Sequence, residues 1–177
     1  MALARASPAV SRLPSLACRQ HRPFWFGATS PEPEPENIFL RILRGEAPAE
    51  VIQDGDELFT FHDHNPASTT HLLVIPKRFI RDASLLTPGD APLVRRMQSK
   101  AVELVQAYAP DFVESELAMG FHWPPAYSVP WLHLHAIYPI ARMRRRWKYT
   151  PLSFKSPEWV LDRLQRQGLV FRPPGHR

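Results

Sequence analysis

Cysteine is almost absent from this sequence. The single cysteine, Cys18, lies near the N-terminus, so the rest of the chain can form neither a disulfide nor a thiolate zinc site and offers no cysteine nucleophile. Uninterrupted apolar runs long enough to cross a membrane are also missing, and no membrane partner is expected. The 177 residues instead suit one globular domain with extensions, because a chain of this length can bury a sizeable core.

Acidic residues are missing from the first 31 positions. Arg5, Arg12, Arg19 and Arg22 are the only charged residues there, so the net charge of +5 drops to +1 for the rest of the chain. The basic balance is therefore mostly a property of this leader, and a nucleic-acid partner is not expected from it. A segment rich in Ala, Ser and Arg that lacks Asp, Glu and Lys is typical of organelle transit peptides. We expect mitochondrial import, with plastid import, or a disordered tail on a cytoplasmic or nuclear protein, as the alternatives.

Composition divides the chain into three segments. Residues 1–36 combine the leader with a stiff Pro/Glu linker, Ser30–Glu36, and are predicted to be disordered. Residues 37–140 form the predicted domain. Residues 141–177 form a basic extension that contains a helix, with Ser156 as N-cap and a span from Pro157 to about Gln167.

Hydrophobic patterns within the domain predict an α+β fold. Asn37 is a suitable N-cap for a short first helix, and apolar residues at helical spacing predict a long helix from Pro88 or Asp90 to Ala107. Alternating and β-branched runs predict strands at residues 51–53, 57–62, 69–76 and 117–122, and a last strand that opens at Ser128 and closes at Pro139. We therefore expect an antiparallel meander of about five strands, with the long helix packed on it and a C-terminal helical extension.

Two histidines share one face of the last predicted strand. Because side chains alternate along a strand, His133 and His135 point to the same side as Trp131. One imidazole could then react while the other donates or accepts protons, although two histidines on a half-exposed strand would show the same spacing. His71 falls within the predicted central strand. It is either a core histidine bonded to a backbone carbonyl or a residue that supports catalysis.

Around these histidines the sequence resembles the histidine triad (HIT) family, and specifically its Hint branch. The resemblance rests on Ser128–Pro139, Phe61-His62-Asp63, Thr70–Lys77 and the opening segment Asn37–Pro48. Residues Met119–Pro125 are most similar to the third Hint subgroup and contain a Gly-Phe-His element that is also found in aprataxin. The resemblance covers roughly residues 37–168, and several separate motifs occur in the family's order.

Membership of this family would imply a HIT-like fold and a homodimer with a continuous sheet. It would also imply an enzyme that hydrolyses or transfers purine nucleoside monophosphates, typically releasing AMP from a phosphoramidate or a related adenylylated substrate. No cofactor is predicted, because histidines and backbone amides can carry the electrostatic work on one α-phosphate.

The family motif assigns roles around the scissile bond. Its central histidine, which attacks the α-phosphorus and forms a nucleotidyl-histidine intermediate, corresponds to His133. A second register would make His133 the first histidine of the motif, but the flanking residues favour the first register. By resemblance, His135 would contact a phosphate oxygen, and Ser128 with the Val129 backbone would lie near the phosphate and the leaving group. His71 would fix the tautomer and orientation of His133.

Other matched positions would bind the nucleotide. Asp63 corresponds to the family's ribose-binding acid, a role that suits a carboxylate because it can accept from both ribose hydroxyls; alternatively it caps a turn. His122, within the Gly-Phe-His element, would supply another phosphate contact. The base and its apolar walls would involve Phe61, His62, His64, Ile38 and Phe39.

Two departures from the family pattern leave rival hypotheses open. Trp131 takes the place of the first triad histidine, and because indole does not titrate in this range, the chain could be a catalytically weak nucleotide-binding or interaction protein. Asn37 and Leu40 stand where zinc-containing relatives carry Cys-x-x-Cys, so no structural zinc is predicted. A third hypothesis, removal of AMP from DNA ends as in aprataxin, rests on the basic run Arg142–Lys148, which could equally be a solvated face or a dimer contact.

Overall fold

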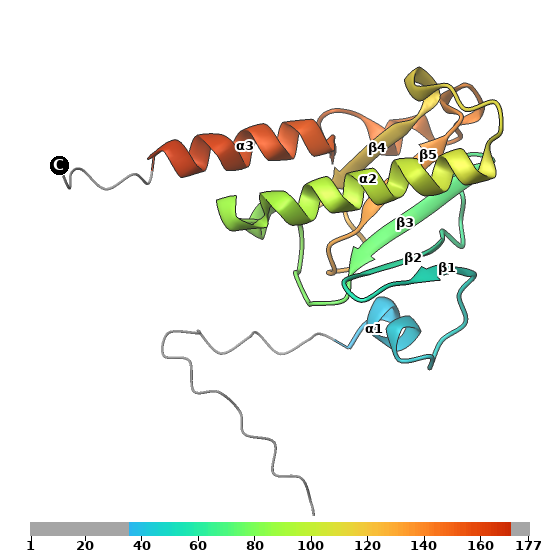
Figure 1. Ribbon diagram of the computed structural model, residues 1–177, viewed down its shortest axis with the longest axis horizontal. Helices are drawn as coiled ribbons and strands as arrows, with labels where there is room; N and C mark the ends of the chain where they lie inside the picture. The colour runs from blue at the N-terminus through green and yellow to red at the C-terminus, as the bar shows by residue number, and fades with distance from the viewer. Residues whose placement is uncertain (1–35, 171–177) are drawn as a thin grey trace, which may run out of the picture. The chain divides into compact units, whose positions relative to one another are not determined.

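The computed structural model describes residues 36–170, which belong to one compact unit (Figure 1). The predicted transit peptide, its linker up to Pro35 and the end of the basic extension from residue 171 lie outside the described residues. Within residues 36–170, no helix is both long and apolar enough to cross a bilayer.

A six-stranded antiparallel sheet lies at the centre of the fold, in the order β1-β2-β3-β5-β4-β6. The strands are β1 (Val51–Asp54), β2 (Leu58–His62), β3 (Thr70–Pro76), β4 (Ala118–His122), β5 (Leu134–Tyr138) and β6 (Phe154–Lys155). The predicted α+β class is confirmed. Two details differ from the predicted five-stranded meander: β5 lies between β3 and β4, and the extension contributes β6 as a sixth strand.

The central strand β3 follows directly from its sequence. All seven of its residues are buried, and it pairs with β2 on one side and β5 on the other. An apolar, β-branched run is typical of a strand that is covered on both faces. Leu72 and Val74 face one core, whereas Leu73 and Ile75 face a second core on the opposite side of the sheet.

Helices cover both faces of the sheet. On one face, α2 (Ala91–Tyr108), preceded by a 3-10 turn at Pro88–Asp90, packs beside α3 (Pro157–Val170), as Figure 1 shows. The apolar stripe predicted for α2 is buried there, and Val160 and Leu164 of α3 enter the same core. The remaining 3-10 turns span Ala83–Leu85, Glu114–Glu116, Ile140–Arg142 and Arg146–Tyr149.

The first helix, α1 (Ile38–Leu43), contributes to the core on the opposite face. Asn37 caps it as predicted, because its side-chain oxygen accepts from the backbone N–H groups of Phe39 and Leu40 at 2.9 and 3.2 Å. Phe39 and Leu40 are buried, but Ile38 is 43% exposed. Ile38 therefore does not share the buried face of α1.

The last predicted strand begins later than expected. It starts at Leu134 instead of Ser128, because Pro130 has no N–H group for a ladder and the Trp131 N–H bonds to the Val129 carbonyl two residues back, at 2.9 Å. The predicted alternation is nevertheless present: Leu132 and Leu134 enter the core under α2, whereas Trp131 joins the core on the α1 face.

Candidate active site

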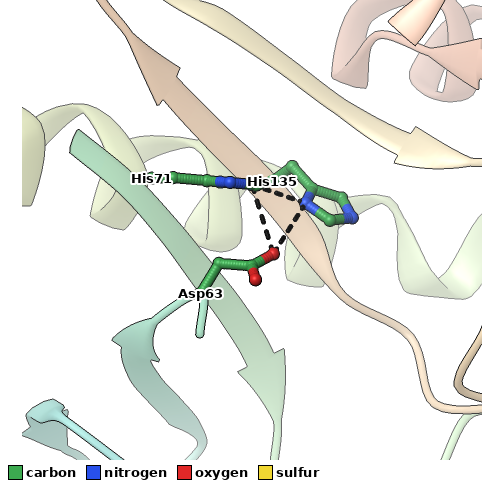
Figure 2. Close-up of side chains that lie close together, drawn as sticks. All are labelled: Asp63, His71 and His135. Carbon is green, nitrogen blue, oxygen red and sulfur yellow. Dashed lines mark hydrogen bonds and ion pairs between the residues drawn. The ribbon is translucent and has the colours of Figure 1, made fainter. Parts of the chain in front are cut away.

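Two neighbouring strands bring His71 and His135 together. β3 and β5 are antiparallel, with Leu73 opposite His135 and His71 opposite Ile137, so the two histidines are diagonal neighbours on one face. Their imidazoles meet at 2.8 Å between His71 Nε2 and His135 Nδ1 (Figure 2). Both residues are buried.

Backbone contacts determine which nitrogens of this pair carry protons. The Ala67 N–H donates to His71 Nδ1 at 3.0 Å, so a neutral His71 carries its proton on Nε2 and donates it to His135 Nδ1. The proton of a neutral His135 must then sit on Nε2. That nitrogen is buried and has no hydrogen-bond partner within residues 36–170. A buried donor without a partner is costly and is typical of a site that a ligand completes.

His133 has the opposite tautomer. Its Nδ1 lies 2.5 Å from the Trp131 carbonyl oxygen, and because a carbonyl can only accept, Nδ1 carries the proton. The lone pair on Nε2 is thus available for attack. The Phe39 ring packs on this imidazole in a T-shaped arrangement, with 5.3 Å between ring centroids.

Burial keeps these imidazoles neutral near pH 7. It is the largest cause in each case, and it lowers the pKa of His71 and of His122 to about 4. Burial also lowers the pKa of His133, and it lowers the pKa of His135 well below the ordinary value of 6.5. A neutral imidazole is the form that can act as a nucleophile or as an N–H donor.

A cavity of about 470 Å³ opens beside the histidines. Of the predicted site residues, it is lined by His133, His135, Ser128, Asp63, His64 and His122. The other lining residues are Asn65, Ala67, Ala126, Arg145, Trp147, Lys148, Tyr149 and Ser153. A space of this size is in the range of small-molecule sites.

Asp63 caps a turn and also lies close to the histidine pair. Its Oδ1 accepts the Asn65 N–H at 2.9 Å, which confirms the turn-capping alternative. Its Oδ2 lies 3.5 Å from His71 Nε2 and 4.0 Å from His135 Nδ1 (Figure 2). Ribose binding by Asp63 stays a prediction.

The role predicted for His71 needs correction. Its imidazole bonds to His135 and to the Ala67 N–H instead of orienting His133 or bonding to a backbone carbonyl. The tautomer of His133 is instead fixed by the carbonyl of Trp131. His71 therefore acts on the proposed phosphate donor, His135.

Four residues predicted to contact the base or form its apolar walls, His62, Phe61, Phe39 and Ile38, are not among the residues that line the cavity. His62 points to the other face of β2, where its ring packs on Tyr108 at 5.4 Å between centroids, because adjacent side chains of a strand face opposite sides. Phe61 is 3% exposed and packs in the core with Phe39. Ile38 is exposed and is not among the cavity residues. Val129 packs against the α1 core.

The C-terminal extension forms a cavity wall that sequence reasoning missed. The Arg144 N–H donates to the Ala67 carbonyl at 2.6 Å, and the Tyr149 ring lies 5.4 Å from that of His122. Phe154 covers Gly120 so closely that a Cβ built on the glycine would lie 2.6 Å from the ring. Gly120 was the available signal, because a glycine inside a strand often marks a close approach of another group.

Asp63, His71 and His135 together could also hold a metal ion, since one ligand atom of each lies within 4.8 Å of the others. A His/His/Asp set suits zinc. The 2.8 Å separation of the two nitrogens, however, is that of a hydrogen bond. As they stand, the two histidines form a hydrogen-bonded pair with the Asp63 carboxylate 3.5 Å from His71.

Comparison with known proteins gives concordant matches. Residues 36–149 match the family described as "Scavenger mRNA decapping enzyme C-term binding". Adenosine 5'-monophosphoramidase HINT3 of Xenopus tropicalis is 31% identical over 133 residues, which is 72% of this chain and 86% of the relative. A bifunctional adenosine 5'-phosphosulfate phosphorylase/adenylylsulfatase, HINT4 of Arabidopsis thaliana, is 33% identical over 72% of this chain and 90% of the relative.

Solved structures share the fold. A HIT family hydrolase from Legionella pneumophila superposes with a TM-score of 0.52 at 29% identity, covering 56% of this chain and 89% of that chain. The architecture and the sequence matches therefore point to the same group of proteins.

Proposed function

Because this chain belongs to the Hint branch of the histidine triad superfamily, we propose that it releases AMP from adenosine 5'-phosphoramidates through a nucleotidyl-His133 intermediate. The observation that carries the proposal is the tautomer of His133. Its Nδ1–H is bound to the Trp131 carbonyl, which leaves a neutral Nε2 lone pair at the cavity.

In the first step, His133 Nε2 attacks the α-phosphorus and forms a new P–N bond. The bond from phosphorus to the substrate amine breaks, and the amine leaves after it takes up a proton. The attacking ring gains positive charge, and the Trp131 carbonyl at 2.5 Å from Nδ1 stabilises that charge.

The second step is hydrolysis of the intermediate. Water attacks the phosphorus, the bond to His133 Nε2 breaks, and AMP departs. In both steps the phosphate oxygens need hydrogen-bond donors. His135 supplies its otherwise unpartnered Nε2–H, and Ser128 and His122 lie in the same cavity wall.

The relatives support this chemistry. The matched HINT3 proteins carry the name adenosine 5'-monophosphoramidase, and the matched HINT4 protein acts, by its name, on adenosine 5'-phosphosulfate. Both names describe cleavage next to the α-phosphate of an adenosine nucleotide. The proposed substrate for this chain is accordingly an adenosine nucleotide with a substituent on that phosphate.

The test is AMP release from adenosine 5'-phosphoramidate by wild type, His133→Ala and His62→Ala. We expect the first variant to lose activity and to retain its fold by circular dichroism. The His62→Ala variant should stay active, because His62 packs on Tyr108 away from the cavity. Rapid-quench mass spectrometry of the wild type should detect a protein adduct with the mass of one adenylyl group.

The alternative, a nucleotide-binding protein with little turnover, predicts a different result. Wild type and His133→Ala would both bind AMP, and neither would release it from the phosphoramidate. A DNA-adenylate substrate would show itself by AMP release from an adenylated nick at a rate above that on the phosphoramidate. Import into mitochondria and pairing into a homodimer stay proposals. A dimer with a continuous sheet would have to pair through β1 or β6, the edge strands in this part of the chain.

A further inference from the structure

The C-terminal extension places two cations and an exposed aromatic ring at the candidate active site. Arg145, Trp147 and Lys148 all line the 470 Å³ cavity with the catalytic histidines. We name these three residues the cationic rim. Trp147 is 72% exposed, and the Lys148 ammonium lies 5.4 Å from its ring centroid.

The rim is held in place by specific contacts. Arg145 donates to the Asn65 side-chain oxygen at 2.7 Å, and its neighbour Arg144 is tied by its backbone N–H to the Ala67 carbonyl at 2.6 Å. Arg145 has a φ of +55°, a left-handed conformation that is unfavourable for a residue with a Cβ. Such strain persists where the surroundings impose it, and it is concentrated at functional sites.

The charge of the rim is not neutralised by the protein. Within residues 36–170, no carboxylate forms an ion pair with Arg145 or Lys148, and Asp63 is the only carboxylate among the cavity-lining residues. Asp63 is directed toward His71 and His135 instead. Because the buried histidines are neutral, they can donate hydrogen bonds to the α-phosphate but add no charge.

A substituted α-phosphate carries one negative charge, and it has the donors of His135 and Ser128 nearby. The two rim cations therefore favour a second anionic group in the substrate. Apart from adenosine and its α-phosphate, the substrate consists only of the leaving group, so the second anionic group has to belong to the leaving group. A cationic amine would be repelled by the same two residues.

Resting on the proposed function, we propose that the cationic rim binds a leaving group that carries a negative charge, with Arg145 and Lys148 pairing with its carboxylate or phosphate. The substrates would be AMP conjugates of anionic amines. The exposed face of Trp147 provides a contact for a planar or apolar part of the same group.

The experiment compares AMP phosphoramidates of four short amines: propylamine, 1,3-diaminopropane, β-alanine and 2-aminoethyl phosphate. We expect wild type to show a kcat/KM for the carboxylate and phosphate conjugates about tenfold above that for the neutral one, equivalent to about 1.4 kcal/mol. The cationic conjugate should be the poorest. The ratio between the carboxylate and phosphate conjugates identifies which anion the rim prefers.

Two variants locate the effect. The double variant Arg145→Gln/Lys148→Gln should bring the anionic-to-neutral ratio close to one. Arg142→Gln, which removes an exposed charge from the same basic run outside the cavity, should keep the wild-type ratio. Circular dichroism and thermal melting check that each variant is folded.

A wild type that shows no preference for anions, or a preference that survives in the double variant, would overturn the proposal. If none of the four conjugates is hydrolysed, the proposed function fails. The rim is then still tested by calorimetric titration of the same conjugates, since a loss of anion preference in the double variant supports it and equal affinities refute it.

Discussion

Acid should destabilise this protein through its buried histidines, and His71 is the one that a glutamine can replace while keeping its hydrogen bonds. Its side chain is 0% exposed, and burial is the largest cause that lowers its pKa from 6.5 to about 4; the Asp63 carboxylate opposes this shift, whereas His122 and His133 add to it. The folded protein therefore binds this proton at lower pH than the unfolded chain. Stability from His71 is fully present above pH 6.5 and is lost progressively as the pH falls to about 4.

The magnitude follows from the difference between the two pKa values. One pKa unit corresponds to about 1.4 kcal/mol, so a shift from 6.5 to about 4 is worth about 3 kcal/mol of unfolding free energy. A loss of this size is a large share of the stability of an ordinary domain.

The assay is urea unfolding at about pH 7.5 and about pH 4 with wild type and His71→Gln. A glutamine amide does not titrate, yet its oxygen can accept the Ala67 N–H and its NH₂ can donate to His135, as His71 does. The stability lost between the two pH values should be about 3 kcal/mol smaller in the variant. His64→Gln is the matched control, because the His64 side chain is 97% exposed and its removal should leave the loss unchanged. Equal losses in wild type and His71→Gln would refute the reasoning.

Three further predictions concern the site and its wall. Gly120→Ala should lower stability by about 1–3 kcal/mol, because the new Cβ would lie 2.6 Å from the Phe154 ring. Thermal melting compares this variant with Gly168→Ala, whose new Cβ would lie 3.6 Å from its nearest neighbour. Trp131→His should cost about 3 kcal/mol in urea unfolding and keep kcat, since the contact to His133 comes from the backbone; a large fall in kcat would contradict this. The acid limb of kcat/KM should lie below pH 6.5, because burial lowers the pKa of His133 and activity is lost only as that ring becomes protonated; a limb at or above 6.5 would argue against it.

Local signals made much of the fold predictable. The apolar, β-branched run at residues 70–76 specified the buried strand β3, and Asn37 specified the start of α1. The regular spacing of Leu93, Val94, Met97 and Ala101 specified the buried face of α2. In each case the residues that decide the structure are neighbours in the sequence, so their pattern is sufficient.

The contacts that were missed are between distant parts of the chain. The extension reaches the cavity because Phe154 can lie on Gly120 and the Arg144 N–H can meet the Ala67 carbonyl. Neither contact leaves a periodic trace in the sequence around residue 150. The same holds for His71, whose partner is 64 positions away, so the pattern located the histidine but not the ring that it contacts.

Trp131 replaces the first triad histidine, and its contacts show which atoms of residue 131 act on His133. The Trp131 side chain serves the core: it is 1% exposed, its ring packs on Phe79, and its Nε1–H donates to the Pro76 carbonyl at 2.9 Å. Its carbonyl oxygen alone meets His133 Nδ1, and every residue type carries that oxygen. The tautomer of the proposed nucleophile, His133, therefore depends on the backbone between residues 131 and 133 and tolerates a change of side chain at residue 131. What the tryptophan cannot provide in the proposed reaction is a proton for the departing amine. Because burial keeps His122 and His135 neutral near pH 7, that proton has to come from solvent or from the substrate.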